Sequence, residues 1–453
     1  MKVNDSIFRE YDIRGIADRD LNDSLVHDIG RAIGTFLLRQ NGTSVAIGRD
    51  CRVSSPRLHS SLSDGLVAVG MRVVDVGLVP TPLLYFATHR LSTSGGIMIT
   101  GSHNPGEHNG LKICVGASTI HGKDIQSLKH TVELGDFFTP KSPGTLEKVS
   151  LEDDYIDFIA NTVRIERPVK VVVDAGNGMG GQIASRLYRA MGCEVISLFE
   201  EYDGTFPNHH PDPTVLDNLD TLIKTVRATG AAVGIGFDGD ADRIGVVDCS
   251  GRALFGDELL VIFARDVLAK MPGATIISEV KASHRLFHDI AARGGKPILW
   301  KTGHSLIKAK MGESGAVLAG EMSGHIFFKD RYFGFDDAIY AGARVIEILA
   351  QSHKSLMGLI SDLPQSVSTP EIRVDCPDET KFEVVSKARQ KFENMGLNVN
   401  SMDGARVDFD DGWGLVRASN TQPVLVYRFE AENKARLDEI RSLIEGVVSS
   451  CLH

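Results

Sequence analysis

Three carboxylates stand at alternate positions in the segment GFDGDADR: Asp238, Asp240 and Asp242. They follow an apolar run, 232–237, whose composition is typical of a strand. In an extended chain, residues two apart point to the same side, so we expect the three carboxylates to lie together. Because like charges repel at short range, this group favours a hard cation, Mg²⁺ above all, over a solvated acidic turn.

The segment ITGSHNP, at residues 99–105, places a hydroxyl, an imidazole and an amide side by side between glycine and proline. Three interpretations compete for Ser102 and His103. The segment is an ordinary turn, a hydrolase nucleophile with its base, or a hydroxyl that carries a phosphoryl group. All three remain open on this segment alone.

Two further loops are rich in polar side chains. GEMSGH, at residues 320–325, carries a carboxylate, a hydroxyl and an imidazole, which can hydrogen-bond sugar hydroxyls, and His325 can move a proton. RASNTQP, at residues 417–423, follows a guanidinium with three hydrogen-bonding side chains, a grouping that suits a phosphate dianion. Taken alone, each segment is as compatible with a surface loop or turn.

A glycine-rich turn offers a competing interpretation. Gly176–Gly181 fits the pattern G-x-G-x-x-G after an apolar run, 169–173, and opens a helical stretch. Glu200 and Glu201 follow about twenty residues later, as in a dinucleotide site with its pyrophosphate at the helix N-terminus. The segment fits better as a strand-to-helix turn of the kind common in parallel α/β domains, because the other motifs form a site that needs no nicotinamide.

The elements that must position these loops alternate between short β-rich runs and amphipathic helical stretches. This alternation predicts mixed or parallel sheets covered by helices on both faces. The strands are expected at 44–48, 72–76, 96–100, 169–173, 232–237 and 274–278, and helices at 55–71 and 181–191.

The last segment has a different pattern. Antiparallel strands followed by one closing helix predict an α+β module appended to the α/β body. The strands are expected at 372–375, 406–408, 414–418 and 424–430, and the helix at 435–448.

We therefore expect three successive α/β domains and a C-terminal α+β domain, with the active site in a central cleft. Each domain contributes one of the four polar loops, in the order of Ser102, Asp238, Glu321 and Arg417. Pro/Gly-rich or acidic breaks place the domains at 1–148, 149–250, 251–366 and 367–453.

Composition bounds the class of protein. A chain of 453 residues is longer than an ordinary domain with a single hydrophobic core. A content of 42% hydrophobic and 24% charged residues is typical of a soluble globular chain. Six scattered cysteines argue against a zinc site or a disulfide framework. With neither an apolar signal region nor a membrane-length run, we expect a cytoplasmic protein. The net charge of −10 argues against a nucleic-acid partner.

Four motifs, TGSHNP, DGDADR, GEMSGH and RASNTQP, occur here in order. They resemble the phosphoserine, metal, sugar-binding and phosphate-binding loops of the α-D-phosphohexomutase family, and most closely its bacterial phosphomannomutase/phosphoglucomutase branch. The resemblance covers essentially the whole chain. Further agreement comes from FREYDIRG (8–15), VPTP (79–82), WKTGHSLIK (300–308) and FGFDDAIY (333–340).

The resemblance implies an isomerase that moves a phosphoryl group reversibly between C1 and C6 of a mannose or glucose phosphate. Phosphorylated Ser102 would phosphorylate the bound sugar monophosphate, and the resulting glucose (or mannose) 1,6-bisphosphate would reorient and return its other phosphate. Ser102 then needs no base beside it, which suits adjacent side chains that seldom meet in nucleophile–base geometry. The implied partners are hexose phosphates, with no nucleic acid and no membrane, for a monomer or weak dimer.

The resemblance also implies roles for individual residues. Mg²⁺ would be held by Ser102 with Asp238, Asp240 and Asp242. Catalytic roles would fall to Ser102, His103, Lys112, Arg243 and His325, and the general base stays open among the candidates. The implied substrate-binding residues are Tyr11, Arg14, Lys281, His304, Glu321, Ser323, His325, Arg417, Ser419, Asn420 and Thr421.

The 3- and 4-hydroxyls of the sugar would be bound by Glu321 and Ser323, so a site of this kind would accept both mannose and glucose. A phosphoglucosamine mutase is the first competing interpretation, and Met322 argues against it. The chain could instead be a phosphoserine-dependent sugar phosphatase, a nicotinamide oxidoreductase built on the glycine-rich turn, or an inactive sugar-phosphate binder. Ala241 stands where close relatives often have glycine, and we expect an ordinary φ there.

Overall fold

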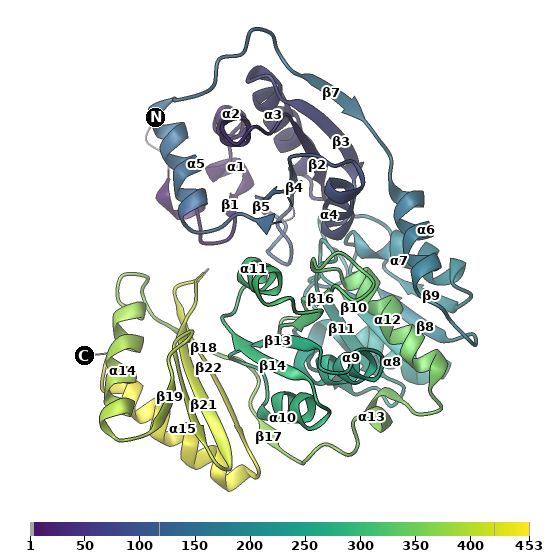
Figure 1. The fold of residues 1–453 in the computed structure, drawn as a ribbon, viewed down its shortest axis with the longest axis vertical. Coiled ribbons are helices and arrows are strands. Elements are labelled where there is room, and N and C mark those ends of the chain that lie inside the picture. Colours follow the sequence, from purple (N-terminus) through teal and green to yellow (C-terminus); the bar gives the residue numbers. More distant parts are fainter. Residues whose placement is uncertain (1–3, 117, 421, 453) are drawn as a thin grey trace.

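The computed structural model describes residues 4–116, 118–420 and 422–452. Within these residues, four β-sheets follow one another along the chain. The first three are mixed sheets with helices, and the fourth is antiparallel, which confirms the predicted α/β body with a C-terminal α+β module. Figure 1 shows the first sheet at the top, the second and third sheets below it, and the fourth beside the third.

The first sheet has the strand order β1-β5-β4-β2-β3-β7, and β6 pairs with β5. Its central parallel strands β2, β3 and β4 are largely apolar because apolar clusters cover both faces of the sheet, whereas the edge strand β7 is exposed. Helix α2 begins after Asn22, whose side chain accepts a hydrogen bond from the Leu25 amide. The elements are η1 (Asp5–Ile7), β1 (Ile13–Ile16), α1 (Ala17–Asp20), α2 (Asp23–Arg39), β2 (Ser44–Arg49), α3 (Ser55–Ala68), β3 (Arg72–Leu78), α4 (Thr81–Arg90), β4 (Gly95–Ile99), β5 (His108–Val115), β6 (Ser118–Thr119), α5 (Lys123–Leu134) and β7 (Thr145–Lys148).

The second sheet has the order β12-β11-β10-β8-β9. Strands β9, β8 and β10 are parallel, and β11 returns antiparallel to β10, so a tight loop joins these two central strands. The elements are α6 (Glu152–Thr162), β8 (Lys170–Asp174), α7 (Gly180–Ala190), β9 (Glu194–Leu198), η2 (Leu216–Leu219), α8 (Asp220–Thr229), β10 (Val233–Phe237), β11 (Ile244–Asp248) and β12 (Ala253–Leu254).

The third sheet has the order β14-β13-β15-β16, in which only the pairing of β15 with β16 is antiparallel among the described strands. Its last long helix, α12, is buried all round and packs against the second unit, where the Tyr188 hydroxyl donates to the Ile339 carbonyl at 2.9 Å. The elements are α9 (Gly256–Lys270), β13 (Thr275–Glu279), α10 (His284–Ala292), β14 (Lys296–Trp300), α11 (His304–Ser314), β15 (Leu318–Gly320), β16 (Ile326–Phe328), α12 (Ala338–Gln351) and α13 (Leu356–Leu359).

The fourth sheet has the order β17-β22-β21-β20-β19, and β18 also pairs with β22. Two helices pack on it, and α15 begins after Asn433, whose side chain accepts from the Arg436 amide. The elements are β17 (Val367–Ser368), β18 (Ile372–Asp375), α14 (Lys381–Asn394), β19 (Asn398–Asn400), β20 (Ala405–Phe409), β21 (Gly412–Ala418), β22 (Val424–Ala431) and α15 (Lys434–Ser449).

The packing of the cores separates the fourth sheet from the rest. One apolar cluster runs from a face of the first sheet through α4 into the second and third units, whereas the fourth has a cluster of its own. A small group, Val280, Trp413 and Leu415, joins the fourth unit to the third. The expected domain boundaries remain a prediction, and β12 pairs with β11 although it lies beyond the expected boundary at residue 250. Across the described residues, no helix combines the length and the apolar character that crossing a membrane requires.

Candidate active site

A cavity of about 410 Å³ lies where loops from all four units converge. Its lining is rich in arginine, lysine and histidine, so it suits an anionic ligand. Thr421, which was predicted from the sequence to bind substrate, lies outside the described residues. The predicted site residues that line the cavity are Tyr11, Arg14, Ser102, His103, Lys112, Arg243, Lys281, His304, Glu321, Ser323, His325, Arg417, Ser419 and Asn420.

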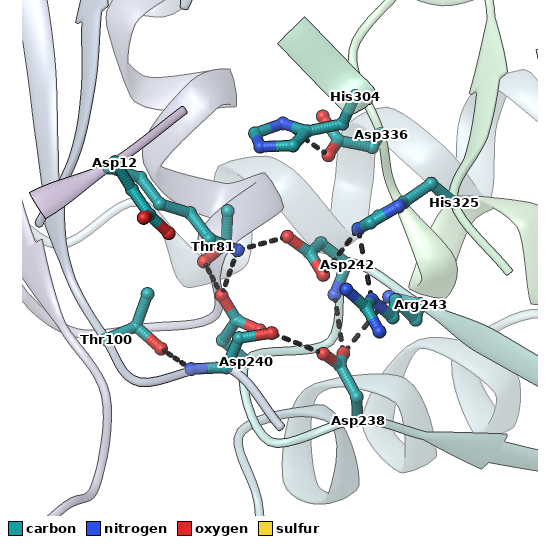
Figure 2. Close-up of polar contacts among 12 residues, drawn as sticks. Asp12, Thr81, Thr100, Asp238, Asp240, Asp242, Arg243, His304, His325 and Asp336 are labelled. Carbon is teal, nitrogen blue, oxygen red and sulfur yellow. Dashed lines mark hydrogen bonds and ion pairs between the residues drawn. The ribbon is translucent and has the colours of Figure 1, made fainter. Parts of the chain in front are cut away.

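The three aspartates of the DGDADR segment lie together, but not for the expected reason. The segment is a turn between β10 and β11 rather than extended chain, with the Ala241 amide donating to the Asp238 carbonyl at 3.1 Å. One carboxylate oxygen of Asp238 also accepts from the amides of Asp242 and Arg243, at 3.1 Å each. The turn brings the oxygens of Asp238, Asp240 and Asp242 within 4.8 Å of one another (Figure 2).

Ala241 adopts a left-handed backbone conformation, with φ of +61°, so the expectation of an ordinary φ was wrong. The tight turn that gathers the carboxylates requires this conformation, and the residue is fully buried within it. A Cβ atom in the left-handed region costs roughly 1 kcal/mol or more relative to glycine. The alanine therefore adds strain to the loop.

Ser102 also has a positive φ, of +49°. Its hydroxyl donates to a carboxylate oxygen of Asp238 at 2.9 Å, and its amide donates to the Thr100 hydroxyl oxygen at 2.9 Å. The same hydroxyl lies 3.1 Å from Nδ1 of His103. The expectation that these adjacent side chains would not meet was wrong, because the left-handed turn at Ser102 brings both to one side of the loop.

Lys112 joins the first unit to the aspartates of the second. Its Nζ donates to Oδ2 of Asp240 at 2.6 Å and also contacts Asp242. Burial opposes the charge on this ammonium, but the neighbouring carboxylates outweigh it and raise the pKa of Lys112. Lys112 is therefore a cation at neutral pH, able to stabilise negative charge but not to accept a proton.

The aspartate cluster has the properties of a site for a hard cation. Its carboxylates are fully buried, and one oxygen of Asp240 has no hydrogen-bond donor among the described residues. Buried carboxylate oxygens without partners are costly unless a cation neutralises them. Three such ligands beside the Ser102 hydroxyl fit Mg²⁺, which prefers oxygen donors.

His325 belongs to the sugar-binding loop expected from the sequence and points toward Asp242 (Figure 2). Its Nδ1 is 2.8 Å from Glu321 and 3.1 Å from the Ser323 hydroxyl, and its Nε2 is 3.3 Å from both Asp242 and Arg243. Burial opposes a charge on the ring, but Asp242 outweighs it and the pKa of His325 is raised to about 9.

Two other imidazoles in the cavity are shifted the opposite way. Burial, together with the charges of Arg243 and Arg14, lowers the pKa of His103 well below its usual value. Burial and the nearby Lys308 do the same to the pKa of His304, whose ring centroid is 5.5 Å from that of His325. The pKa of His325 is therefore raised, whereas the pKa values of His103 and His304 are lowered, in one cavity.

The far side of the cavity is closed by contacts between the first and fourth units. Asn420 donates to the hydroxyl oxygen of Tyr11 at 2.8 Å, and that hydroxyl donates to the Thr302 carbonyl at 3.2 Å. Arg417 pairs with Asp403 at 3.1 Å. These contacts place a guanidinium and an amide from the fourth unit in the wall of the cavity that the Ser102 loop also lines.

The glycine-rich turn at 176–181 has a structural use. A side chain at Gly178 would meet the backbone of Gly239, and one at Gly180 would meet the Phe237 ring. The Met179 amide donates to the Gly239 carbonyl at 2.9 Å. The glycines thus allow the turn to pack against the loop of aspartates, which supports a strand-to-helix turn over a dinucleotide site.

The sequence did not identify several polar residues of the site. The Thr81 hydroxyl donates to Asp240 at 2.5 Å, and Asn104 accepts from Arg14 at 2.8 Å. Glu371 pairs with Lys281 at 3.0 Å across the junction of the third and fourth units. Position next to a motif was the only available signal, since Thr81 lies within VPTP and Asn104 within TGSHNP.

Comparison with known families agrees with this geometry. Residues 5–137, 153–251 and 255–367 match the family models of phosphoglucomutase/phosphomannomutase alpha/beta/alpha domains I, II and III. Residues 371–446 match the model of the C-terminal domain of the same family.

Individual relatives extend over nearly the whole chain. A phosphomannomutase/phosphoglucomutase of Pseudomonas syringae is 50% identical over 98% of this chain and 95% of its own length. A phosphoglucomutase of Neisseria gonorrhoeae is 44% identical over 100% of this chain and 98% of its own length. The crystal structure of a phosphoglucomutase/phosphomannomutase family protein from Burkholderia thailandensis superimposes with a TM-score of 0.93 at 43% identity, covering 99% and 98% of the two chains.

Proposed function

The chain belongs to the phosphoglucomutase/phosphomannomutase family, and we propose that it interconverts the 1- and 6-phosphates of mannose, glucose or both through phosphorylated Ser102. The observation that carries this proposal is the Ser102 hydroxyl, which is buried beside Asp238 at the base of a cavity lined by cations from all four units. A sugar phosphate, which is an anion, fits such a cavity, and the Ser102 hydroxyl is available there for phosphoryl transfer.

In the proposed cycle, the bond between phosphorus and Ser102 Oγ breaks as a sugar hydroxyl oxygen bonds to phosphorus. The hydroxyl proton passes to a base in the cavity, and Ser102 Oγ takes up a proton. The sugar 1,6-bisphosphate then turns, and its other phosphate returns to Ser102 by the reverse transfer. Lys112 stays protonated and stabilises charge on the transferring oxygens.

The aspartate cluster fits Mg²⁺ because its buried carboxylates lie together and include an Asp240 oxygen without a donor among the described residues. Asp238, Asp240, Asp242 and the Ser102 oxygen would hold the ion, which when bound supplies charge that offsets the phosphoryl group. Asp238 and Thr81 contribute without it, because they fix Ser102 and Asp240 by hydrogen bonds.

The two ends of the cavity would recognise different parts of the substrate. Arg417, with Ser419 and Asn420, offers donors for the phosphate that does not react. Glu321 and Ser323, from the third unit, offer acceptors and a donor for sugar hydroxyls. A site that grips the sugar away from C2 accepts both mannose and glucose, which differ only there.

The test is a product analysis by ³¹P NMR. Wild-type protein with Mg²⁺ and a trace of glucose 1,6-bisphosphate is given mannose 1-phosphate, glucose 1-phosphate or glucosamine 1-phosphate. We expect 6-phosphates of mannose and glucose, and none with Ser102→Ala. Inorganic phosphate formed faster than any 6-phosphate would support the phosphatase instead, and preference for the amino sugar would support a phosphoglucosamine mutase.

A further inference from the structure

The guanidinium of Arg52 lies directly beneath the loop that carries Ser102. Its Nη2 donates to the carbonyls of Ser102 at 2.7 Å and Asn104 at 2.6 Å. Its Nη1 donates to the carbonyls of Pro105 at 2.6 Å and His108 at 3.0 Å. A single fully buried side chain therefore holds four carbonyls of one short loop.

Asp50 completes this arrangement from the same strand end. One of its carboxylate oxygens lies 3.3 Å from Nε of Arg52 and accepts from the Gly101 amide at 3.2 Å. The other accepts from the Arg52 amide at 3.0 Å and the Ser55 hydroxyl at 2.5 Å. The charge of Arg52 is thus balanced, and the backbone on both sides of Ser102 is tied to β2 and α3.

The packing around Arg52 leaves little freedom. A side chain at Gly101 would come within 2.5 Å of the guanidinium carbon. The Phe206 ring, from a loop of the second unit, lies 5.1 Å from that carbon. Gly204 of the same loop packs against the backbone of Cys51 and Arg52. The guanidinium is therefore fixed from both units.

The hydrogen bonds from Arg52 to these four carbonyls determine the orientation of the Ser102 loop. In a trans peptide the carbonyl and the following amide point in opposite directions. Because the Ser102 carbonyl points to Arg52, the amide of His103 points away from Arg52, and both Ser102 and His103 line the cavity. Among the described residues, the His103 amide has no hydrogen-bond acceptor.

We propose that Arg52 is a positioning residue for phosphoryl transfer: its four carbonyl contacts hold Ser102 in the left-handed conformation and aim the His103 amide at the phosphoryl group. This inference rests on the proposed function. A left-handed residue persists only where its surroundings hold it there, and fixed amides stabilise developing charge without reorganisation. Misplacement of a reacting group by about 1 Å can lower a rate about 10²-fold.

A purely structural role would mean that Arg52 only stabilises the first unit. Arg57, on helix α3 of the same unit, supplies a matched control. It donates to the carbonyls of Leu21 and Ala17 at 3.0 and 3.1 Å, but it does not contact the Ser102 loop. Lysine at either position keeps the charge and loses the forked geometry.

The experiment compares Arg52→Lys and Arg57→Lys with wild-type protein. For Arg52→Lys we expect kcat to fall at least tenfold, KM for the sugar phosphate to change less than threefold, and labelling of Ser102 by glucose 1,6-bisphosphate to slow in parallel. Hydrogen–deuterium exchange should increase in residues 101–108 and stay unchanged elsewhere. Arg57→Lys should show none of these changes, although its melting temperature should be similar to that of Arg52→Lys.

Two results would overturn the proposal. One is a hydrogen–deuterium exchange rate in residues 101–108 of Arg52→Lys that equals the wild-type rate. The other is a fall in kcat that follows only the loss of folded protein, equally in both variants. Exchange is measured without turnover, so it tests the role of Arg52 in the loop even if wild-type protein proves not to be a mutase. Absence of Ser102 labelling in wild-type protein would instead count against the proposed function.

Discussion

Strain is concentrated at two residues of the site. Ser102 and Ala241 both adopt positive φ, and neither is glycine. They belong to the two loops that meet through the hydrogen bond from Ser102 to Asp238. Strained residues of this kind often mark sites where geometry serves chemistry, and here each one turns a polar group toward the same point.

Replacing Ala241 by glycine tests the strain at that residue. We expect Ala241→Gly to raise the free energy of unfolding by up to about 1 kcal/mol, because relief of left-handed strain exceeds the added entropy of the unfolded chain. Activity should change less than twofold, since the methyl group is not a ligand. The measurement is thermal unfolding, with Ala343→Gly inside helix α12 as a control that should be destabilising. Destabilisation by Ala241→Gly would contradict the account.

Removing one carboxylate charge tests the cation site. Asp240→Asn should lower mutase activity roughly 10²-fold and weaken Mg²⁺ binding, because a buried carboxylate oxygen is replaced by a neutral amide. Titration calorimetry with Mg²⁺ and steady-state kinetics measure the two effects. The exposed Asp217→Asn is the control. Equal Mg²⁺ affinity in Asp240→Asn and wild-type protein would argue against the proposed ligand.

At the scale of elements, the strands that precede each polar loop were predictable, because buried parallel strands are short apolar runs. The expected strand at 232–237 corresponds to β10 (Val233–Phe237), and the expected closing helix at 435–448 to α15 (Lys434–Ser449). The loops were less predictable. Residue spacing alone does not distinguish an extended segment from a turn. The carboxylates of Asp238, Asp240 and Asp242 therefore meet in a turn, and not along an extended segment as expected.

The role of Arg52 was not predictable for a related reason. Its four acceptors are backbone carbonyls, which every residue possesses, so the sequence carries no complementary side chain that would reveal the contact. Similarly, the contact between Ser102 and His103 depends on a positive φ at a serine, which propensity does not indicate. Three-dimensional packing supplies both.

The loop between β9 and η2, which covers Arg52, carries a pH-sensitive contact. His209 lies 3.0 Å from Asp174 at the end of β8, and this hydrogen bond raises the pKa of His209. The folded state then binds the proton more tightly than the unfolded state. The resulting stabilisation is complete below the ordinary imidazole pKa of about 6.5 and is lost as pH rises through the raised value.

The variant His209→Gln should therefore unfold at a lower temperature than wild-type protein at pH 6. This difference should shrink as pH rises toward 9. Thermal unfolding across this range measures it, with His210→Gln at the exposed neighbouring position as a control. A difference that grows with pH would show that the sign of the linkage is wrong.

At the scale of the whole molecule, the fourth unit is our candidate for a lid over the cavity. It has its own apolar core, and a small apolar group together with ion pairs such as Lys281–Glu371 and His284–Asp408 joins it to the third unit. Its contact with the first unit runs through Asn420 and Tyr11 over the cavity. We expect it to act as a lid that excludes water, which would otherwise compete for the phosphoserine.

The variant Tyr11→Phe removes the hydroxyl that links the first unit to Asn420 of the lid and to Thr302 of the third unit. We expect KM to rise about fivefold with kcat within about twofold, since one net hydrogen bond contributes about 1 kcal/mol to closure. Tyr202→Phe is a matched control, because the buried Tyr202 hydroxyl has no hydrogen-bond partner among the described residues. An unchanged KM in Tyr11→Phe would contradict the closing role of this contact.

The central claim is that Ser102 carries the phosphoryl group. The most direct test is the intact mass of wild-type protein and of Ser102→Ala, before and after incubation with glucose 1,6-bisphosphate and Mg²⁺. We predict the added mass of one phosphoryl group on wild-type protein and none on Ser102→Ala. Absence of the group from both proteins, or its presence on both, would contradict the account.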